Sequence, residues 1–166
     1  MSYAVVRTDK MWGTDNRVGI VSVQYNGASS TKTAIENGNV VVLSGLLANE
    51  REIYKGITPA VNSAIQDIVL IATPEVMYDE RKKSLDEFRN EAGDIARGYR
   101  LHSGDIFSVT ADALTGSDMA VGNVVELQAA TKLKVVSSAT SGSTLIGSII
   151  AIETVGPYKY YTIEVA

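Results

Sequence analysis

The sequence contains no cysteine, a single histidine and only three prolines among its 166 residues. Without cysteine the chain forms no disulfide, no thiolate metal site and no cysteine nucleophile. A chain of this length buries a sizeable core without covalent staples, so one domain, or two small lobes sharing a core, is expected.

The sequence also has no excess of basic residues and no long apolar run. Lys and Arg number 15 against 19 Asp and Glu, which gives a net charge of -4. Because this balance offers no surface for a polyanion, we expect no nucleic-acid partner. No apolar run approaches the roughly 20 residues of a membrane helix, and the N-terminus lacks a basic flank before an apolar core. We therefore expect no export signal and no membrane partner.

What is present favours β-structure. Many Val, Ile, Thr and Tyr residues alternate with 14 glycines, a composition typical of strands broken by tight turns. Residues 18–25 alternate as a strand, and residues 68–72 are apolar throughout, which predicts burial on both faces, as in a closed barrel or under a covering helix or arm. We predict a mainly β fold with one or two short helices. A compact barrel- or sandwich-like body spans residues 34–166, and residues 1–33 form an N-terminal arm with the first strands.

One helix is predicted, over residues 84–92. Ser84 and Glu87 have the spacing of a capping box, and Leu85, Phe88 and Ala92 fall on one stripe before Gly93. We expect about two turns of helix. The charged run at residues 78–83 precedes it as a solvated loop.

The sequence also contains an internal echo. Residues 38–43 (Gly-Asn-Val-Val-Val-Leu) return as residues 122–127 (Gly-Asn-Val-Val-Glu-Leu), and residues 104–109 form a fainter third copy. The possible repeat covers residues 35–75 and 119–154. Two readings stay open: two related β subdomains, or a chance similarity between short strands that begin at Gly-Asn or Gly-Asp turns.

Residues suited to catalysis are scarce. His102 stands beside Ser103 and Asp105, but the members of a hydrolase triad converge from separate elements, whereas residues within one turn bond their own backbone. No calcium-loop or phosphate-binding glycine motif is present. We therefore expect no enzyme and no cofactor, and assign no catalytic, cofactor-binding or metal-ligating residue.

Four stretches of strand and turn sequence are informative together: residues 35–43, 72–81, 97–110 and 135–148. In these stretches the chain resembles small head proteins encoded by tailed phages and prophages of gut Firmicutes, specifically capsid decoration proteins. The resemblance implies a structural protein on the capsid exterior of a virion, made in the host cytoplasm, which binds the major capsid protein lattice and self-associates, for example as a trimer.

A decoration protein would need surfaces that hold its neighbours, and the segment 1–33 is the predicted source. Its candidate contact residues are Tyr3, Val5, Trp12 and Tyr25. Tryptophan is enriched at interface hot spots, although Trp12 in the core is an equal reading. The alternative function is a carbohydrate-binding or adhesin module on a particle surface. The strand tyrosines Tyr158, Tyr160 and Tyr161 and the loop at residues 137–144 suggest it, whereas packing at the core edge is the simpler role of those tyrosines.

Overall fold

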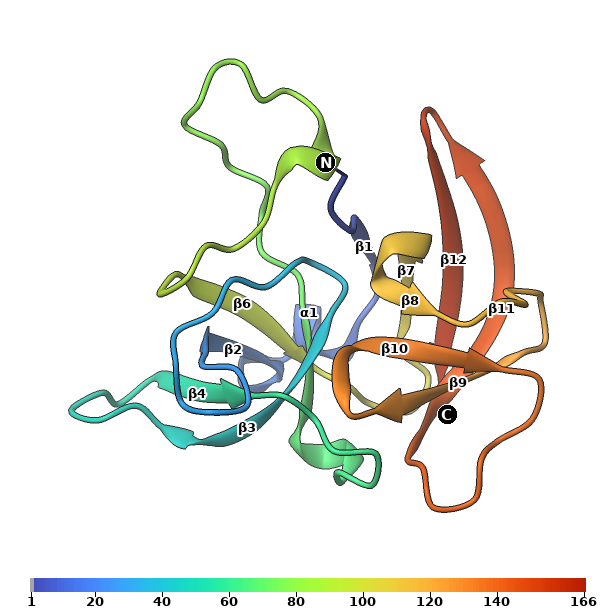
Figure 1. The fold of residues 1–166 in the computed structure, drawn as a ribbon, viewed down its shortest axis with the longest axis horizontal. Coiled ribbons are helices and arrows are strands. Elements are labelled where there is room, and N and C mark those ends of the chain that lie inside the picture. The colour runs from blue at the N-terminus through green and yellow to red at the C-terminus, as the bar shows by residue number, and fades with distance from the viewer. Residues whose placement is uncertain (1) are drawn as a thin grey trace.

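The computed structural model describes residues 2–166 and shows a mainly β protein in which a closed barrel lies beside a curled sheet (Figure 1). The predicted fold class is confirmed. The helical elements are short: α1 (Trp12–Asp15) and the 3-10 turns η1 (Arg17–Gly19), η2 (Ile65–Asp67), η3 (Leu85–Glu87) and η4 (Ala111–Ala113). None of the helices in this described range is long and apolar enough to cross a membrane.

The barrel has five strands, and its interior is narrow. Their spatial order is β2 (Ile20–Tyr25), β4 (Ile53–Ile57), β3 (Val40–Leu46), β5 (Ile68–Ile71) and β6 (Ile95–Arg100), with β6 closing onto β2. A Cβ atom added to Gly56 would lie 2.7 Å from Val23 Cγ1. Because so small a barrel leaves room for side chains alone, it is a packed core and not a channel.

The second sheet has seven strands. In spatial order they are β1 (Val6–Lys10), β7 (Ile106–Thr110), β12 (Tyr158–Val165), β11 (Leu145–Val155), β9 (Val124–Gln128), β10 (Ala130–Val136) and β8 (Leu114–Thr115). All neighbours pair antiparallel except β8 and β10. The β11–β12 hairpin extends well beyond β9 and projects from the body (Figure 1).

Strand β5 joins the two parts because all four of its side chains are buried. Val69 and Ile71 belong to the cluster inside the barrel, which includes Val23. Ile68 and Leu70 belong to a larger cluster that contains Phe107 and other residues of the seven-stranded sheet. This alternation confirms the expected burial of β5 on both faces: one face fills the barrel and the other packs on the sheet.

The three copies of the internal echo form three similar turns. In each turn, a glycine with positive φ is followed by Asn or Asp. One residue of a distant strand makes two backbone hydrogen bonds to this pair: its carbonyl accepts from the glycine N–H, and its N–H donates to the carbonyl of the Asn or Asp. The pairs are Gly38-Asn39 with Ile71, Gly122-Asn123 with Ile149, and Gly104-Asp105 with Val165, at N···O distances of 2.8–3.0 Å. This shared turn geometry is expected under both readings of the echo, so the two related subdomains stay a prediction.

The helix expected over residues 84–92 is reduced to the single turn η3. The capping box is present, since the Glu87 carboxylate accepts hydrogen bonds from the backbone N–H groups of Ser84 and Lys83 at 2.9 and 2.8 Å. The chain then turns away because Asn90 forms a β-bridge with Ile35, and its buried side chain donates to the Ile35 carbonyl at 3.1 Å. A tertiary contact therefore overrides the local helical pattern.

The segment predicted as an arm is part of both sheets. Strand β1 pairs with β7 at one edge of the seven-stranded sheet, and β2 is a barrel strand between β4 and β6. Between them, α1 and η1 carry the chain from one sheet to the other. In this structure the described residues up to 33 are integrated into the body and do not extend from it as a free arm.

Candidate functional site

An open groove of about 920 Å³ lies where the barrel meets the seven-stranded sheet. Its walls come from α1 and η1, from the first residues of β2, from β4, and from the connection between β6 and β7. The residues that the following argument uses are Trp12, Val18, Ile20, Tyr54, Arg100 and His102. The groove is therefore built by elements that the topology, not the sequence order, brings together.

Asp105 organises one wall of the groove. This carboxylate is buried, and its two oxygens accept the backbone N–H groups of Trp12 at 2.8 Å and His102 at 2.9 Å. The two rings lie against each other, with centroids 3.8 Å apart and planes tilted by 45°. By accepting from both backbones, the Asp105 carboxylate holds together the two chain segments that carry these rings.

The same geometry bears on the imagined hydrolase triad. Among the described residues, no hydrogen bond joins the His102 ring to Ser103 or Asp105, and the Asp105 oxygens are directed at backbone amides. A triad needs the carboxylate to orient the imidazole and the imidazole to reach the hydroxyl. Asp105 acts here as the cap of its own turn, as the sequence analysis predicted.

The remainder of the groove combines exposed apolar side chains with cations. Val18 is 70% exposed and Ile20 is 37% exposed, so two branched aliphatic side chains close together in the sequence meet solvent here. Arg100 donates from Nε to the Val18 carbonyl at 3.2 Å, and its guanidinium lies 5.7 Å from the centre of the Tyr54 ring. Arg51 adds a second guanidinium to the lining. Aromatic and Arg side chains of this kind are typical of protein-binding surfaces.

Of the four predicted contact residues, only Trp12 lies in the groove. Val5 is 1% exposed and Tyr25 is 9% exposed, and the Tyr25 hydroxyl is bonded to Thr58 Oγ1 at 2.7 Å. Tyr3 is half-buried under the Arg89 guanidinium, 5.1 Å from its ring centre. Burial in the chain's own core leaves Val5 and Tyr25 with almost no surface to offer a partner in this conformation.

Val18, Ile20, Tyr54 and Arg100 were not among the candidates from the sequence. The alternating pattern at residues 18–25 indicates two faces but does not show which face meets solvent. The first residues of β2 are exposed and its last are buried, because only the second half of the strand enters the core. No local signal distinguishes the two halves.

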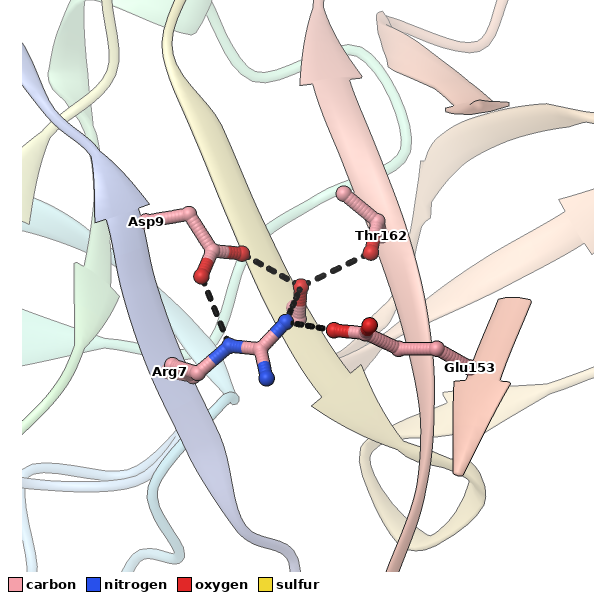
Figure 2. Close-up of polar contacts among 5 residues, drawn as sticks. Arg7, Asp9, Glu153 and Thr162 are labelled. Carbon is pink, nitrogen blue, oxygen red and sulfur yellow. Dashed lines mark hydrogen bonds and ion pairs between the residues drawn. The ribbon is translucent and has the colours of Figure 1, made fainter. Parts of the chain in front are cut away.

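A polar cluster on the outer face of the seven-stranded sheet is the second feature of interest (Figure 2). Arg7 on β1 forms ion pairs with Asp9 and with Glu153 on β11. Beneath it, the buried Ser108 hydroxyl donates to Asp9 at 2.5 Å and shares a hydrogen bond with Thr162 at 2.9 Å. The hydrogen bond to Glu153 is the main cause that raises the pKa of Arg7. The cluster thus ties four strands together across one face.

The carboxylates near η3 are also engaged. Asp79 pairs with Arg81 at 2.9 Å, which lowers the pKa of Asp79, and Glu87 caps the turn. Among residues 2–166 no group of three or more His, Asp or Glu side chains gathers in a way that could hold a metal ion.

The fold and the groove together define a mainly β protein with a surface groove that has an aromatic wall. Comparisons of the chain with protein-family models, with curated proteins and with solved structures found no match.

Proposed function

We propose that this protein is a structural virion protein that decorates a phage capsid and stabilises it by binding the major capsid protein lattice. The resemblance of the sequence to capsid decoration proteins supports this assignment. The structural observation that carries it is the groove beside Trp12, because a half-buried tryptophan, a 70%-exposed Val18 and two arginines meet there on a rigid β body.

The groove is suited to an extended segment of a capsid subunit. Apolar side chains of such a segment would pack on Trp12, Val18 and Ile20, and Arg51 and Arg100 would meet its carbonyl or carboxylate groups. The pinning of the Trp12 backbone by Asp105 holds this wall in place before the partner arrives, which lowers the entropy cost of association. This role needs no catalytic step.

Capsid binding by a Trp12→Ala variant tests the proposal. Purified protein is mixed with undecorated capsids of the phage that encodes it, and bound protein is measured after sedimentation. We expect Trp12→Ala to weaken binding by about tenfold or more, the loss typical of an interface hot spot. The matched control is Tyr78→Ala, which removes an aromatic residue that is 96% exposed elsewhere on the surface. It should bind like the wild type.

The proposal fails if the wild-type protein stays in the supernatant while the capsids are intact and full. Equal losses for Trp12→Ala and Tyr78→Ala would leave capsid decoration standing but would show that the groove is not its binding site.

Glycan binding is the alternative function suggested by the strand tyrosines. Tyr160 and Tyr161 are only 5% and 7% exposed, so these two rings offer little surface to a sugar. Reproducible binding on a glycan array without capsid association would reverse this preference.

A further inference from the structure

The outer half of β11 is an unpaired strand edge. On one side β11 pairs with β12 along its length, as far as Val155. On the other side β9 covers only its beginning: the ladder ends at Ser148, and the last bonds on that side join Ile149 to the turn at residues 122–123. In the described part of the chain, nothing pairs with residues 150–155 on this side. This segment forms the outer border of the projecting hairpin (Figure 1).

The composition of this edge favours pairing with another strand. Residues 150–155 read Ile-Ala-Ile-Glu-Thr-Val, with no proline and one charge, and Ile150 and Val155 are 40% and 48% exposed. Proteins usually protect exposed edges with charges, bulges or very short strands. The edge strand β1 has such protection, with Arg7, Asp9, Lys10 and a bulge, and the other edge strand, β8, has two residues. Strand β11 also has a bulge, between Ile149 and Ala151, but this bulge lies at the inner end of the free edge, and residues 151–155 continue from it in regular register with β12.

The single charge on the β11 edge does not protect it. Glu153 forms an ion pair with Arg7, which reaches it across β7 and β12 on the outer face of the sheet (Figure 2). A carboxylate paired with a cation of its own chain repels an approaching apolar strand less than a free carboxylate does, whereas two such carboxylates directly opposite each other still repel. The same cluster fixes the hairpin to β1 and β7, so the edge is held in an extended shape ready to pair.

We propose that this edge is a self-association surface, at which β11 of one chain pairs antiparallel with β11 of a second copy about a two-fold axis. The axis of such a pair must pass through one residue facing its own copy. An axis at Ile152 places Glu153 opposite Ala151, both of them beyond the bulge and free of β9, and places Thr154 opposite Ile150 at the bulge. The pairing then ends at Thr154, because the next residue would face Ile149, which is bonded to the turn at residues 122–123. An axis at Glu153 would oppose two like charges, and an axis at Ala151 would bring residues 154–155 against residues 147–148, which already pair with β9.

We take a second copy of the chain as the partner for two reasons. Two copies of this edge bring together apolar residues with one paired charge each, and a two-fold axis gives both strands the same free length. Five residues of one strand bury less area than the roughly 1,200 Å² of a stable interface, so the association should be reversible in solution. On any surface that concentrates the protein it would be strengthened. The inference concerns this chain alone and holds whether or not the protein binds capsids.

Sedimentation of the purified protein over a concentration series tests the edge. We expect the wild type to associate as its concentration rises, and Thr154→Lys to weaken the association by about tenfold or more, since a lysine on the edge blocks strand addition. The matched control, Thr31→Lys, adds the same charge in an exposed loop and should leave association within about twofold of the wild type. A wild type that stays monomeric throughout, or a Thr154→Lys variant that associates normally, would overturn the inference.

Single introduced cysteines test the register. Any disulfide must then join the introduced residues, because the chain has no cysteine of its own. In the proposed pair the Cβ atoms at position 152 lie about 5 Å apart across the axis, close enough to cross-link with small adjustment. Those at position 154 lie about 14 Å apart. Under mild oxidation Ile152→Cys should form disulfide-linked dimers and Thr154→Cys should not, with circular dichroism confirming that both variants are folded. Equal cross-linking at the two positions would refute this register. Since only purified protein is used, these results leave the capsid proposal untouched.

Discussion

At the scale of single residues, Asp105 has the most consequential position. It is 4% exposed, and each of its carboxylate oxygens accepts a backbone N–H from a different element, α1 on one side and the β6–β7 connection on the other. Its neighbour Gly104 joins the same turn to β12 through Val165. One side chain therefore fixes the groove wall to the seven-stranded sheet.

Replacement of Asp105 by Ala should both destabilise the protein and loosen the groove. Two partly buried N–H groups would lose their acceptor, so we expect the free energy of unfolding to fall by about 2 kcal/mol. The emission of Trp12, the only tryptophan, should shift to longer wavelength as its ring becomes more exposed to water. Chemical denaturation and fluorescence spectra measure these effects. Asp112→Ala, which changes an exposed aspartate, is the control and should alter neither. An unchanged emission spectrum in Asp105→Ala would contradict this role.

At the scale of elements, two of the repeated turns allow the cost of a strained glycine backbone to be distinguished from the cost of crowding by neighbouring side chains. Gly38 and Gly122 open β3 and β9 with φ values of 83° and 92°. A Cβ added to Gly122 would meet nothing within 4 Å, whereas one added to Gly38 would lie 3.1 Å from side-chain atoms of Val109 and Ala113. The two turns have the same backbone bonds but different surroundings.

Alanine at each of these glycines should therefore have unequal effects. Gly122→Ala should lower the free energy of unfolding by about 1–2 kcal/mol, the cost of a left-handed residue with a side chain. Gly38→Ala should lower it by about a further 1 kcal/mol or more, because buried neighbours must also move. Urea unfolding of the two variants gives the difference directly. Equal losses would show that the core around Val109 adapts without cost.

The same scale shows what the sequence could predict. Strand β5 was correctly expected to be buried on both faces because each of its side chains is apolar, and that demand is local. The helix at residues 84–92 was wrong in extent, since the bridge between Asn90 and Ile35 depends on residues far apart in the sequence. The groove could not be predicted for a related reason: its walls come from elements far apart in the sequence, and of its lining residues only Trp12 was a candidate.

At the scale of the whole molecule, the barrel and the sheet share one core. Leu70 is fully buried and lies in the cluster that contains Phe107 and Ile163 of the seven-stranded sheet, while the adjacent Val69 is equally buried but belongs to the barrel interior. Two bodies that bury each other's apolar faces cannot separate without exposing both. Neither part is therefore expected to be stable alone.

We accordingly predict that the protein unfolds in one cooperative transition. Trp12 fluorescence reports on the junction and far-UV circular dichroism reports on all strands, and the two denaturation curves should coincide. Leu70→Ala, at the shared core, should lower the free energy of unfolding by about 2–5 kcal/mol without separating the two curves. Val69→Ala, on the neighbouring residue inside the barrel, should have a smaller effect because it removes less volume, again with coincident curves. Two resolved transitions in the wild type would contradict a shared core. Splitting in Leu70→Ala alone would show that this contact is what makes the barrel and the sheet unfold as one.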